Sequence, residues 1–583
     1  EIGMADGVAN GNFGPGTQAG LKSSGGISSG SSDGGTAFVS LFQLALAFNG
    51  YDVTRSGVFS AATRTTTLDF QRFLEIAATG DGDYGTWAAL LVSTGDPDRP
   101  VSMIDTTSTM SPAFSAQMKQ AGYDIVGRYL TVTGKAIARG ELDTIFTAGL
   151  RVVPIFQNFN NGPEYFTRAL GLDHGRQAAI RARQLGFQGG TTIFFAVDYD
   201  AFATEIDLLI APYFQGVAEG LSVSVEKKYG VGVYATRNIG ARIAERGLAS
   251  SVWVSGMSTG YSGNLGFAMP PTWSYNQIQE VHSLNIDRNA VSSRARPATR
   301  ADVARTPEQS DAVRSFFWAL VRHSVYAESA VSKQPLVPST AASEFVLDRL
   351  MEAKYHDVPW LAYAPYAEST PGMPPQTALA YTTARIAYLA DAGDIRDIID
   401  NYDGDAEHMA ATARTAKLWG TSAGSSAVEF GDLGGWSLDL VTLWKSYRLS
   451  SQKAITAFVN QHLGAPGSPA EFPEDDLIAD ADGWLLAKGM MEGKSVADAF
   501  QALLVSSTSW RDRLGLFLDG RFGSPATLSA AVATVFGPTW PWPGLPRYLF
   551  LGREELPNAS ELVELRSAVT TRLYLLAGRS ATP

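Results

Sequence analysis

The chain lacks cysteine and has little histidine. None of its 583 residues is Cys, so disulfides, thiolate metal sites and a thiol nucleophile are excluded. Only six residues are His, and they are widely scattered, which argues against a histidine-based metal cluster. Charged residues make up 18% of the chain and the net charge is -12. Because an acidic protein repels phosphates, we expect no nucleic-acid partner.

Long hydrophobic runs are also missing. No stretch of 18 apolar residues occurs, so we expect no transmembrane segment. No charged-then-apolar segment opens the chain, as a signal peptide would. The remaining composition, 45% hydrophobic, is that of a globular protein long enough for three or four domains.

Changes in composition divide the chain into four parts. Glycine and serine dominate 23–35, and proline and glycine mark a linker near 93–100. A polar segment with arginine and proline at 293–307 forms a second linker. The predicted parts are a partial repeat with a Gly/Ser linker at 1–37, a small all-α module of three helices at 38–95, an α/β domain at 101–292 and a mostly helical domain at 308–583.

Strands and helices alternate through 101–292, which favours a parallel sheet with helices outside. Seven or eight strands in this length predict a small (β/α) barrel with some helices missing. A doubly wound open sheet is the alternative, although no Gly-x-Gly-x-x-Gly follows a first strand. The predicted strands are Val101–Asp105, Ile125–Leu130, Arg151–Gln157, Thr192–Asp198, Gly230–Ala235, Ser251–Ser255 and Thr272–Ile278.

Two carboxylates follow the most apolar of these strands. The run Ile193–Val197 predicts a strand buried on both faces, and Asp198 and Asp200 come directly after it. Crowded carboxylates shift each other's pKa, so one can hold a proton while the other stays ionised. Glycoside hydrolysis needs that division of roles. From spacing alone, a solvated strand end or a cation site explains the pair as well.

Further polar and aromatic residues stand at or near the ends of the other strands. Sugar-binding sites combine such groups, because hydroxyls need hydrogen bonds and sugar faces stack on rings. The candidates are Asp105, which we group with the catalytic carboxylates, and the substrate-binding residues Arg128, Tyr129, Gln157, Tyr199, Tyr234, Trp253, Trp273, Tyr275, Gln277 and Asp287.

The segment 38–92 resembles the peptidoglycan-binding three-helix module. The phrases that carry the resemblance follow its pattern in order and include Val39-Ser40-Leu41-Phe42-Gln43, Gly57-Val58-Phe59, Asp69-Phe70-Gln71 and Thr86-Trp87-Ala88-Ala89-Leu90. Residues 1–24 resemble a fragment of a preceding copy. The resemblance implies binding to cell walls or docking against the protein's own enzyme domain.

The segment 101–292 resembles the glycoside-hydrolase-like barrel domain related to family 25 type lysozymes. The motifs are Asp105 after an apolar strand, the strand ending in Asp198-Tyr199-Asp200, the phrase Ser258-Thr259-Gly260-Tyr261-Ser262-Gly263-Asn264-Leu265-Gly266, and Ile286-Asp287. The resemblance implies that Asp200 is the proton donor, that Asp198 stabilises or positions the reacting N-acetyl group, and that Asp105 and Asp287 orient them and bind sugar. It implies no cofactor and no metal.

One departure concerns the proton donor. Asp200 stands where lysozymes have Glu, so its carboxyl group is one methylene shorter. The resemblances together imply a secreted or cell-wall-associated hydrolase of peptidoglycan or a related bacterial glycan. A weak or inactive glycan-binding protein, or a component or cargo of a secreted assembly, is the alternative. The sequence leaves the oligomeric state open.

The helical domain at 308–583 resembles no family that we recognise. Aspartates beside Gly-Trp pairs, Asp432, Asp439, Asp480 and Asp482, are expected to cap helices. Alternatively they converge on a cation or substrate pocket, together with His408 and Glu328. Such an oxygen-rich set would suit Ca²⁺ or Mg²⁺ rather than Zn²⁺.

Overall fold

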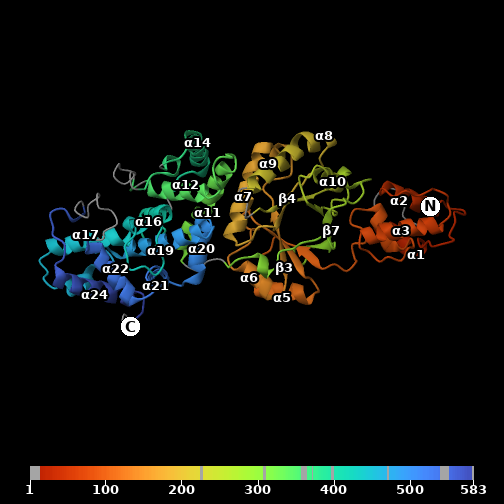
Figure 1. Cartoon of the computed structure of the whole chain (residues 1–583). Helices are drawn as coiled ribbons and strands as arrows, with labels where there is room; N and C mark the ends of the chain where they lie inside the picture. The colour runs from red at the N-terminus through yellow and green to blue at the C-terminus, as the bar shows by residue number, and fades with distance from the viewer. Residues whose placement is uncertain are drawn as a thin grey trace. The chain divides into compact units, whose positions relative to one another are not determined.

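The computed structural model describes residues 13–222, 228–305, 310–352, 354–355, 364–370, 372–395, 399–468, 472–538 and 550–580. The predicted segment 1–37, the second linker and the domain at 308–583 each include residues outside these ranges. The chain forms two compact units, Glu1–Ala304 and Arg305–Pro583. The first unit holds a helical module and a barrel, and the second is helical (Figure 1).

The module contains α1 (Pro15–Ser24), α2 (Phe38–Phe48), α3 (Ala61–Phe73) and α4 (Tyr84–Leu91). The last three account for the three helices predicted at 38–95. Side-chain oxygens of Ser60 and Asp83 cap α3 and α4. Trp87 is fully buried, and its indole donates a hydrogen bond to the Gly25 carbonyl, 2.8 Å away, which ties α1 to α4.

The centre of the first unit is a closed eight-stranded barrel in sequential order. Strands β1 to β7 run parallel, whereas β8 is antiparallel to both β7 and β1. Closure therefore decides against the open-sheet alternative. The strands are β1 (Met103–Asp105), β2 (Ile125–Tyr129), β3 (Arg151–Phe156), β4 (Thr192–Ala196), β5 (Gly230–Ala235), β6 (Ser251–Val254), β7 (Trp273–Val281) and β8 (Ile286–Val291).

In the described part of the barrel, α-helices follow the first five strands only. Among the described residues, a 3₁₀ turn (Ser262–Asn264) is the helical element between β6 and β7, and β7 and β8 form a hairpin, as expected for a barrel with helices missing. Glycines let α7 and α9 approach closely, since a Cβ on Gly171 would lie 2.0 Å from the Tyr213 carbonyl oxygen (Figure 1). The helices are α5 (Pro112–Gln120), α6 (Glu141–Thr147), α7 (Arg168–Gln184), α8 (Ala203–Glu205), α9 (Ala211–Leu221) and α10 (Arg237–Glu245).

The module and the barrel contact each other within the first unit. The backbone N–H and hydroxyl of Ser293 donate to the Glu75 carboxylate, and the Ser93 hydroxyl donates to the Gly256 carbonyl, 2.6 Å away. Ser93 also accepts a bond from the Asn276 amide, 2.9 Å away. The segment predicted as a linker is thus fixed to the barrel wall at Ser93.

The second unit has two apolar cores that share α19 (Glu474–Met491). Ile478 and Leu486 face the first core, whereas Leu477 and Trp484 face the second. None of the described helices is long and apolar enough to cross a membrane. The other helices are α11 (Asp311–Val331), α12 (Ala341–Met351), α14 (Pro375–Ala392), α16 (Ala406–Trp419), α17 (Trp436–Leu449), α18 (Ile455–His462), α20 (Val496–Ser506), α21 (Trp510–Arg521), α22 (Pro525–Phe536) and α24 (Ala559–Leu576).

Candidate functional site

Two carboxyl groups lie side by side where the barrel closes. Asp105 ends β1 and is the register partner of Asp287 on β8. Gln277 on β7 donates hydrogen bonds to both, 2.7 Å to Asp287 and 3.4 Å to Asp105. Asn289 donates a further bond to Asp105 over 2.8 Å. Three of the predicted site residues, from the first and the last two strands, are therefore brought together.

Burial and mutual repulsion shift the titration of this pair. Burial raises the pKa of Asp105, and the carboxylate of Asp287 raises it further. Burial, followed by the charge of Glu280, also raises the pKa of Asp287. Bonds from Gln277 and Asn289 offset only part of the effect. Two interacting carboxyl groups of this kind share a proton near neutral pH.

Aromatic rings fill the barrel below this pair. Tyr234 stacks on Trp253 with ring centroids 4.8 Å apart, and the Trp253 ring also contacts Tyr275 at 5.2 Å. Trp253 and Tyr275 are fully buried and form the barrel core, so their predicted contact with substrate does not follow from their position. Tyr129 and Tyr234 remain candidate substrate-binding residues. Burial is the largest cause that raises the pKa of both hydroxyls, and the charges of Asp105, Asp287 and Asp198 raise it further.

Gly127 makes room for this arrangement. It is the register partner of Asp105 on β2. A Cβ at this position would lie 2.5 Å from the Trp253 ring and 2.8 Å from the Asp105 Cβ, closer than real contacts allow. The Trp253 indole can then donate to the Asn289 side-chain oxygen, 2.8 Å away, which orients the amide that Asn289 offers to Asp105.

Asp198 lies in the loop after β4 and is exposed to solvent. Gln157 donates a hydrogen bond to its carboxylate over 3.2 Å, and the buried Asn160 accepts the Asp198 backbone N–H at 2.8 Å. Partial burial raises the pKa of Asp198, and Gln157 and Lys135 lower it by less. Asp198 and Gln157, both predicted as site residues, are therefore brought together.

Asp200 is engaged elsewhere. Its carboxylate accepts the backbone N–H groups of Ser262 and Gly263, at 2.7 and 3.1 Å, and the Ser262 hydroxyl at 2.9 Å. Although burial acts to raise the pKa of Asp200, these three bonds outweigh it and lower the pKa. An ionised Asp200 that anchors a loop is poorly suited to the predicted role of proton donor.

Three other predicted substrate-binding residues make structural contacts through their side chains. Arg128 is fully buried in the barrel wall and donates to Glu141 and to the Thr106 carbonyl, both at 2.6 Å. Trp273 is turned outward by a bulge between β6 and β7, and donates to the Phe73 carbonyl of the module. Tyr199 packs its ring on Phe166. These three residues hold the structure rather than line the mouth.

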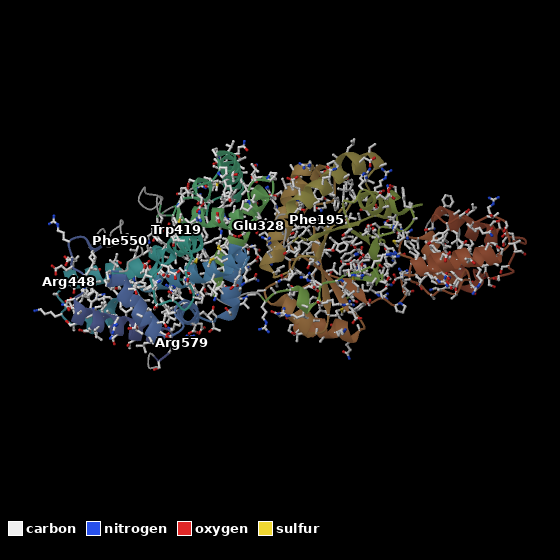
Figure 2. The ribbon with its side chains drawn as sticks, viewed as in Figure 1. Phe195, Glu328, Trp419, Arg448, Phe550 and Arg579 are labelled. Carbon is white, nitrogen blue, oxygen red and sulfur yellow. The ribbon has the colours of Figure 1, made fainter. Side chains whose placement is uncertain are left out.

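The aspartates of the helical unit do not form one pocket. Asp432 pairs with Arg521 at 2.6 Å and Asp482 pairs with Arg513 at 2.9 Å, and all four side chains are almost completely buried. Asp439 and Asp480 instead lie close to His408, so three of the six residues of the predicted cation or substrate pocket are brought together. Glu328 lies on α11 (Figure 2) and is not one of these three.

Comparison with known proteins bears on the barrel first. Residues 116–310 match the family model described as Rv2525c-like, glycoside hydrolase-like domain. The barrel is glycoside hydrolase-like. The match includes Asp198, Asp200 and Asp287, and begins after Asp105. Residues 1–91 match FadG/YbfG, PGDB-like domain, and residues 410–580 match YkzU uncharacterised protein.

Two curated proteins of Bacillus subtilis (strain 168) are similar to this chain. Uncharacterized protein FadG is 41% identical over 286 residues, which cover 48% of this chain and 49% of that protein. Uncharacterized protein YbfG is 36% identical over 328 residues, which cover 53% of this chain and 44% of that protein. The chain thus spans about half the length of the curated relatives it matches.

Two solved structures each align with about a third of this chain. The Mycobacterium tuberculosis Tat-secreted protein Rv2525c in complex with HEPES is 19% identical, with a TM-score of 0.28, over 33% of this chain and 95% of that one. An uncharacterized B. stearothermophilus protein is 17% identical, with a TM-score of 0.27, over 33% of this chain and 97% of that one.

The sequence pattern does not identify the residues that position the three barrel carboxylates. Asn289 and Asn160 hold Asp105 and Asp198, and Ser262 holds Asp200. Asn289 shares strand parity with Asp287, so a strand predicted at 286–291 would have indicated it. Asn160 and Ser262 lie in loops, where no periodicity marks them.

Proposed function

We propose that the barrel hydrolyses a glycan of the bacterial cell wall by carboxylate acid/base catalysis. The observation that supports this is the set Asp105, Asp198 and Asp287, three carboxyl groups with raised pKa values that act on the same two tyrosines, Tyr129 and Tyr234. Carboxyl groups with raised pKa values beside ring surfaces are suited to protonating a glycosidic oxygen.

In this proposal Asp198 replaces Asp200 as the proton donor. Asp198 is exposed and its pKa is raised, whereas Asp200 is held by Ser262 and Gly263 as an anion. The Asp105–Asp287 pair carries at least one negative charge, which would stabilise the positive charge that develops on the sugar ring. Gln157 would fix the orientation of the Asp198 carboxyl group.

Peptidoglycan is the proposed substrate. The support is the resemblance of 38–92 to the peptidoglycan-binding module, together with the glycoside hydrolase-like match of the barrel. Ser293 and Glu75 join the module to the barrel by hydrogen bonds, so binding of the module to a cell wall would hold the barrel at that wall. We propose accordingly that the protein acts at the cell wall after secretion.

The test is release of reducing ends and loss of turbidity from purified cell walls. Asp198→Asn should reduce the rate by about 100-fold or more, since it removes the proton donor. Asp200→Asn should keep activity within about tenfold of wild type, since it weakens the bonds to Ser262 and Gly263 but leaves the proposed proton donor Asp198 and its partner Gln157 in place. Asp124→Asn, an exposed carboxylate paired with Lys119, is the matched control. If Asp200→Asn alone abolishes clearing, the assignment of Asp198 is wrong.

Glycan binding without hydrolysis is the second candidate. It is favoured by the capture of Asp200, since the residue at the lysozyme-like donor position is bound by three hydrogen bonds. In that case wild type sediments with cell walls, releases no reducing ends, and Asp198→Asn sediments equally well.

A further inference from the structure

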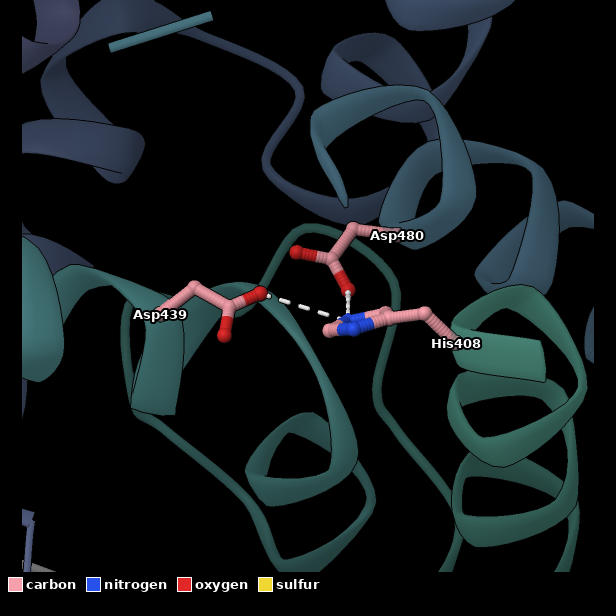
Figure 3. A group of neighbouring side chains, drawn as sticks. All are labelled: His408, Asp439 and Asp480. Atoms are coloured by element: carbon pink, nitrogen blue, oxygen red, sulfur yellow. Dashed lines mark hydrogen bonds and ion pairs between the residues drawn. The ribbon is translucent and has the colours of Figure 1, made fainter. Parts of the chain in front are cut away.

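Three side chains from three helices meet in the helical unit. His408 belongs to α16, Asp439 to the first turn of α17 and Asp480 to α19. The His408 Nε2 atom lies 2.9 Å from an oxygen of Asp480 and 3.3 Å from an oxygen of Asp439 (Figure 3). One ligand-type atom from each of the three lies within 4.8 Å of the other two. The three groups therefore converge on one point rather than pairing separately.

Two carboxylate oxygens of this group accept no hydrogen bond from the described residues. Asp480 is fully buried, and one of its oxygens accepts from His408 and from the Thr412 hydroxyl, 3.0 Å away. Its second oxygen has no hydrogen-bond partner in the described part of the chain, and neither does one Asp439 oxygen. Figure 3 shows this second Asp480 oxygen turned toward Asp439. A single imidazole N–H cannot satisfy both carboxylates.

The surroundings add negative charge. Asp476 lies 3.8 Å from the other imidazole nitrogen, and Asp405 lies 2.5 Å from the Lys354 ammonium group. Four carboxyl groups, Asp405, Asp439, Asp476 and Asp480, thus face two basic side chains, His408 and Lys354. Burial raises the pKa of Asp480 well above its ordinary value, and Asp439 raises it further. Buried carboxylates that face each other need a proton or a cation between them.

Neighbouring residues fix the orientation of the His408 imidazole and allow α17 to come close to Asp480. The Tyr355 hydroxyl lies 2.9 Å from His408 Nδ1, which orients the ring so that Nε2 faces the two aspartates. Gly435 stands directly beside Asp480, because a Cβ there would lie 2.3 Å from an Asp480 oxygen. The glycine lets the start of α17 come close enough to bring Asp439 to the group.

We propose that His408 Nε2 and one oxygen each of Asp439 and Asp480 bind a divalent transition-metal ion such as Mn²⁺ or Zn²⁺. One imidazole with two carboxylates is a mixed nitrogen and oxygen set, whereas Ca²⁺ and Mg²⁺ prefer oxygen alone. Ligand atoms about 2.1 Å from a tetrahedral ion are about 3.4 Å apart, so the observed 2.9 and 3.3 Å separations need only small widening. Asp439 is partly exposed, which leaves a path for the ion.

Binding to the intact chain after removal of metals by a chelator tests the site. Titration calorimetry with Mn²⁺ and with Zn²⁺ at pH 7.5 should show one saturable site, with Mg²⁺ and Ca²⁺ binding at least about tenfold more weakly. Since His408 and Asp480 must lose their protons, binding should weaken as pH falls and should release protons, measured by repeating the titration in two buffers of different ionisation enthalpy.

Asp439→Asn is the chosen variant because its side chain is 18% exposed and it is the least buried of the three. It should weaken binding by more than about tenfold. Glu344→Gln is the matched control, because that carboxylate is 17% exposed and pairs with Lys417 in the same unit. Thermal unfolding in the presence of chelator checks that both variants fold. Absence of a saturable site in wild type, or equal affinity in Asp439→Asn, overturns the proposal.

Discussion

Asp105 and Asp287 are register partners across the antiparallel pair of β1 and β8. Directly opposed side chains on one face lie about 4.5–5.5 Å apart at their Cβ atoms, and like charges there repel. Gln277 donates to both carboxyl groups and so holds them together. The proposed site thus contains a pair that resists losing its last proton.

Replacing one member of this pair should change how barrel stability depends on pH. A carboxyl group whose pKa is raised in the folded state stabilises the fold below its ordinary pKa, and this contribution is lost as pH rises through the folded value. Wild type should therefore lose stability relative to Asp105→Asn as pH rises from 4 to 9. Calorimetric unfolding across that range measures it, with the exposed Asp124→Asn as control. A constant difference between the two proteins would contradict the shared-proton interpretation.

The ion pair of Arg128 and Glu141 should be essential for stability. Both side chains are almost fully buried, and Glu141 also accepts the backbone N–H groups of Met110 and Ala138. Arg128→Met leaves a buried carboxylate without its partner, which costs about 3–5 kcal/mol. Lys119→Met, in a pair that is 41% and 47% exposed, should cost below about 1 kcal/mol. Urea unfolding compares the two, and similar losses would show that Arg128 is not the anchor inferred here.

The space at Gly127 should tolerate no added methyl group. Gly127→Ala places a Cβ against the Trp253 ring and Asp105, and overpacking of this kind costs about 1–3 kcal/mol. It should also quench or shift Trp253 fluorescence and lower glycan activity, since Trp253 orients Asn289. Gly260→Ala is the control, because no atom lies within 4 Å of the Cβ it would add. Equal unfolding midpoints for both variants would refute the steric argument.

The helical unit should lose stability in acid because of His323. Its side chain is completely buried, and Nδ1 lies 2.9 Å from the Tyr388 hydroxyl. Burial, with the charges of Arg322 and Arg349, lowers the pKa of His323 to about 4. A lowered histidine pKa means that stability is full above the unfolded value of about 6.5 and is lost as pH falls through 4.

His323→Phe should remove that dependence. The wild-type loss attributable to His323 amounts to about 3 kcal/mol across this range, from about 1.4 kcal/mol for each pKa unit. The variant should be less stable than wild type at pH 7.5, through the lost bond to Tyr388, and should close that gap near pH 4. Chemical unfolding at several pH values measures the gap. His462→Gln, in the same unit, should leave the wild-type dependence largely intact.

The sequence predicts the ends of the first seven barrel strands well, but it does not predict β8 or the direction of every side chain. Gly127 and Tyr129 face the interior, so the residue between them, Arg128, must face the helices. Strand alternation also predicts that Trp273 and Tyr275 face the same side of β7. A bulge between them turns the Trp273 side chain to the other side. The position of the Asp200 carboxylate depends on its hydrogen bond with Ser262, which lies 62 residues later in a loop. Local periodicity contains no information on either effect.

The helical unit shows the same limit. The sequence predicts the mostly helical character of this domain, but its periodicity does not mark α21 or α22, because glycines interrupt α21 and small residues with Thr and Val fill α22. Arg521 on α21 pairs with Asp432 from 89 positions earlier. Capping, as predicted, is seen for Asp432, whose carboxylate accepts the Glu429 backbone N–H at the start of a 3₁₀ turn (Phe430–Gly434). No side-chain hydrogen bond from the described residues caps α17, although Asp439 lies in its first turn, and the burial of Asp480 follows from helices that meet only in the folded unit.

Closure of the barrel has a consequence for folding. The bond from Asn289 to Asp105 joins residues 184 positions apart, so it forms only when the last strand reaches the first. Contacts of such long range form late, because the loop entropy must be overcome before they contribute. The shared proton of the carboxyl pair is therefore acquired only by a completed ring, and its uptake during refolding would time the final step by which the chain becomes competent to act.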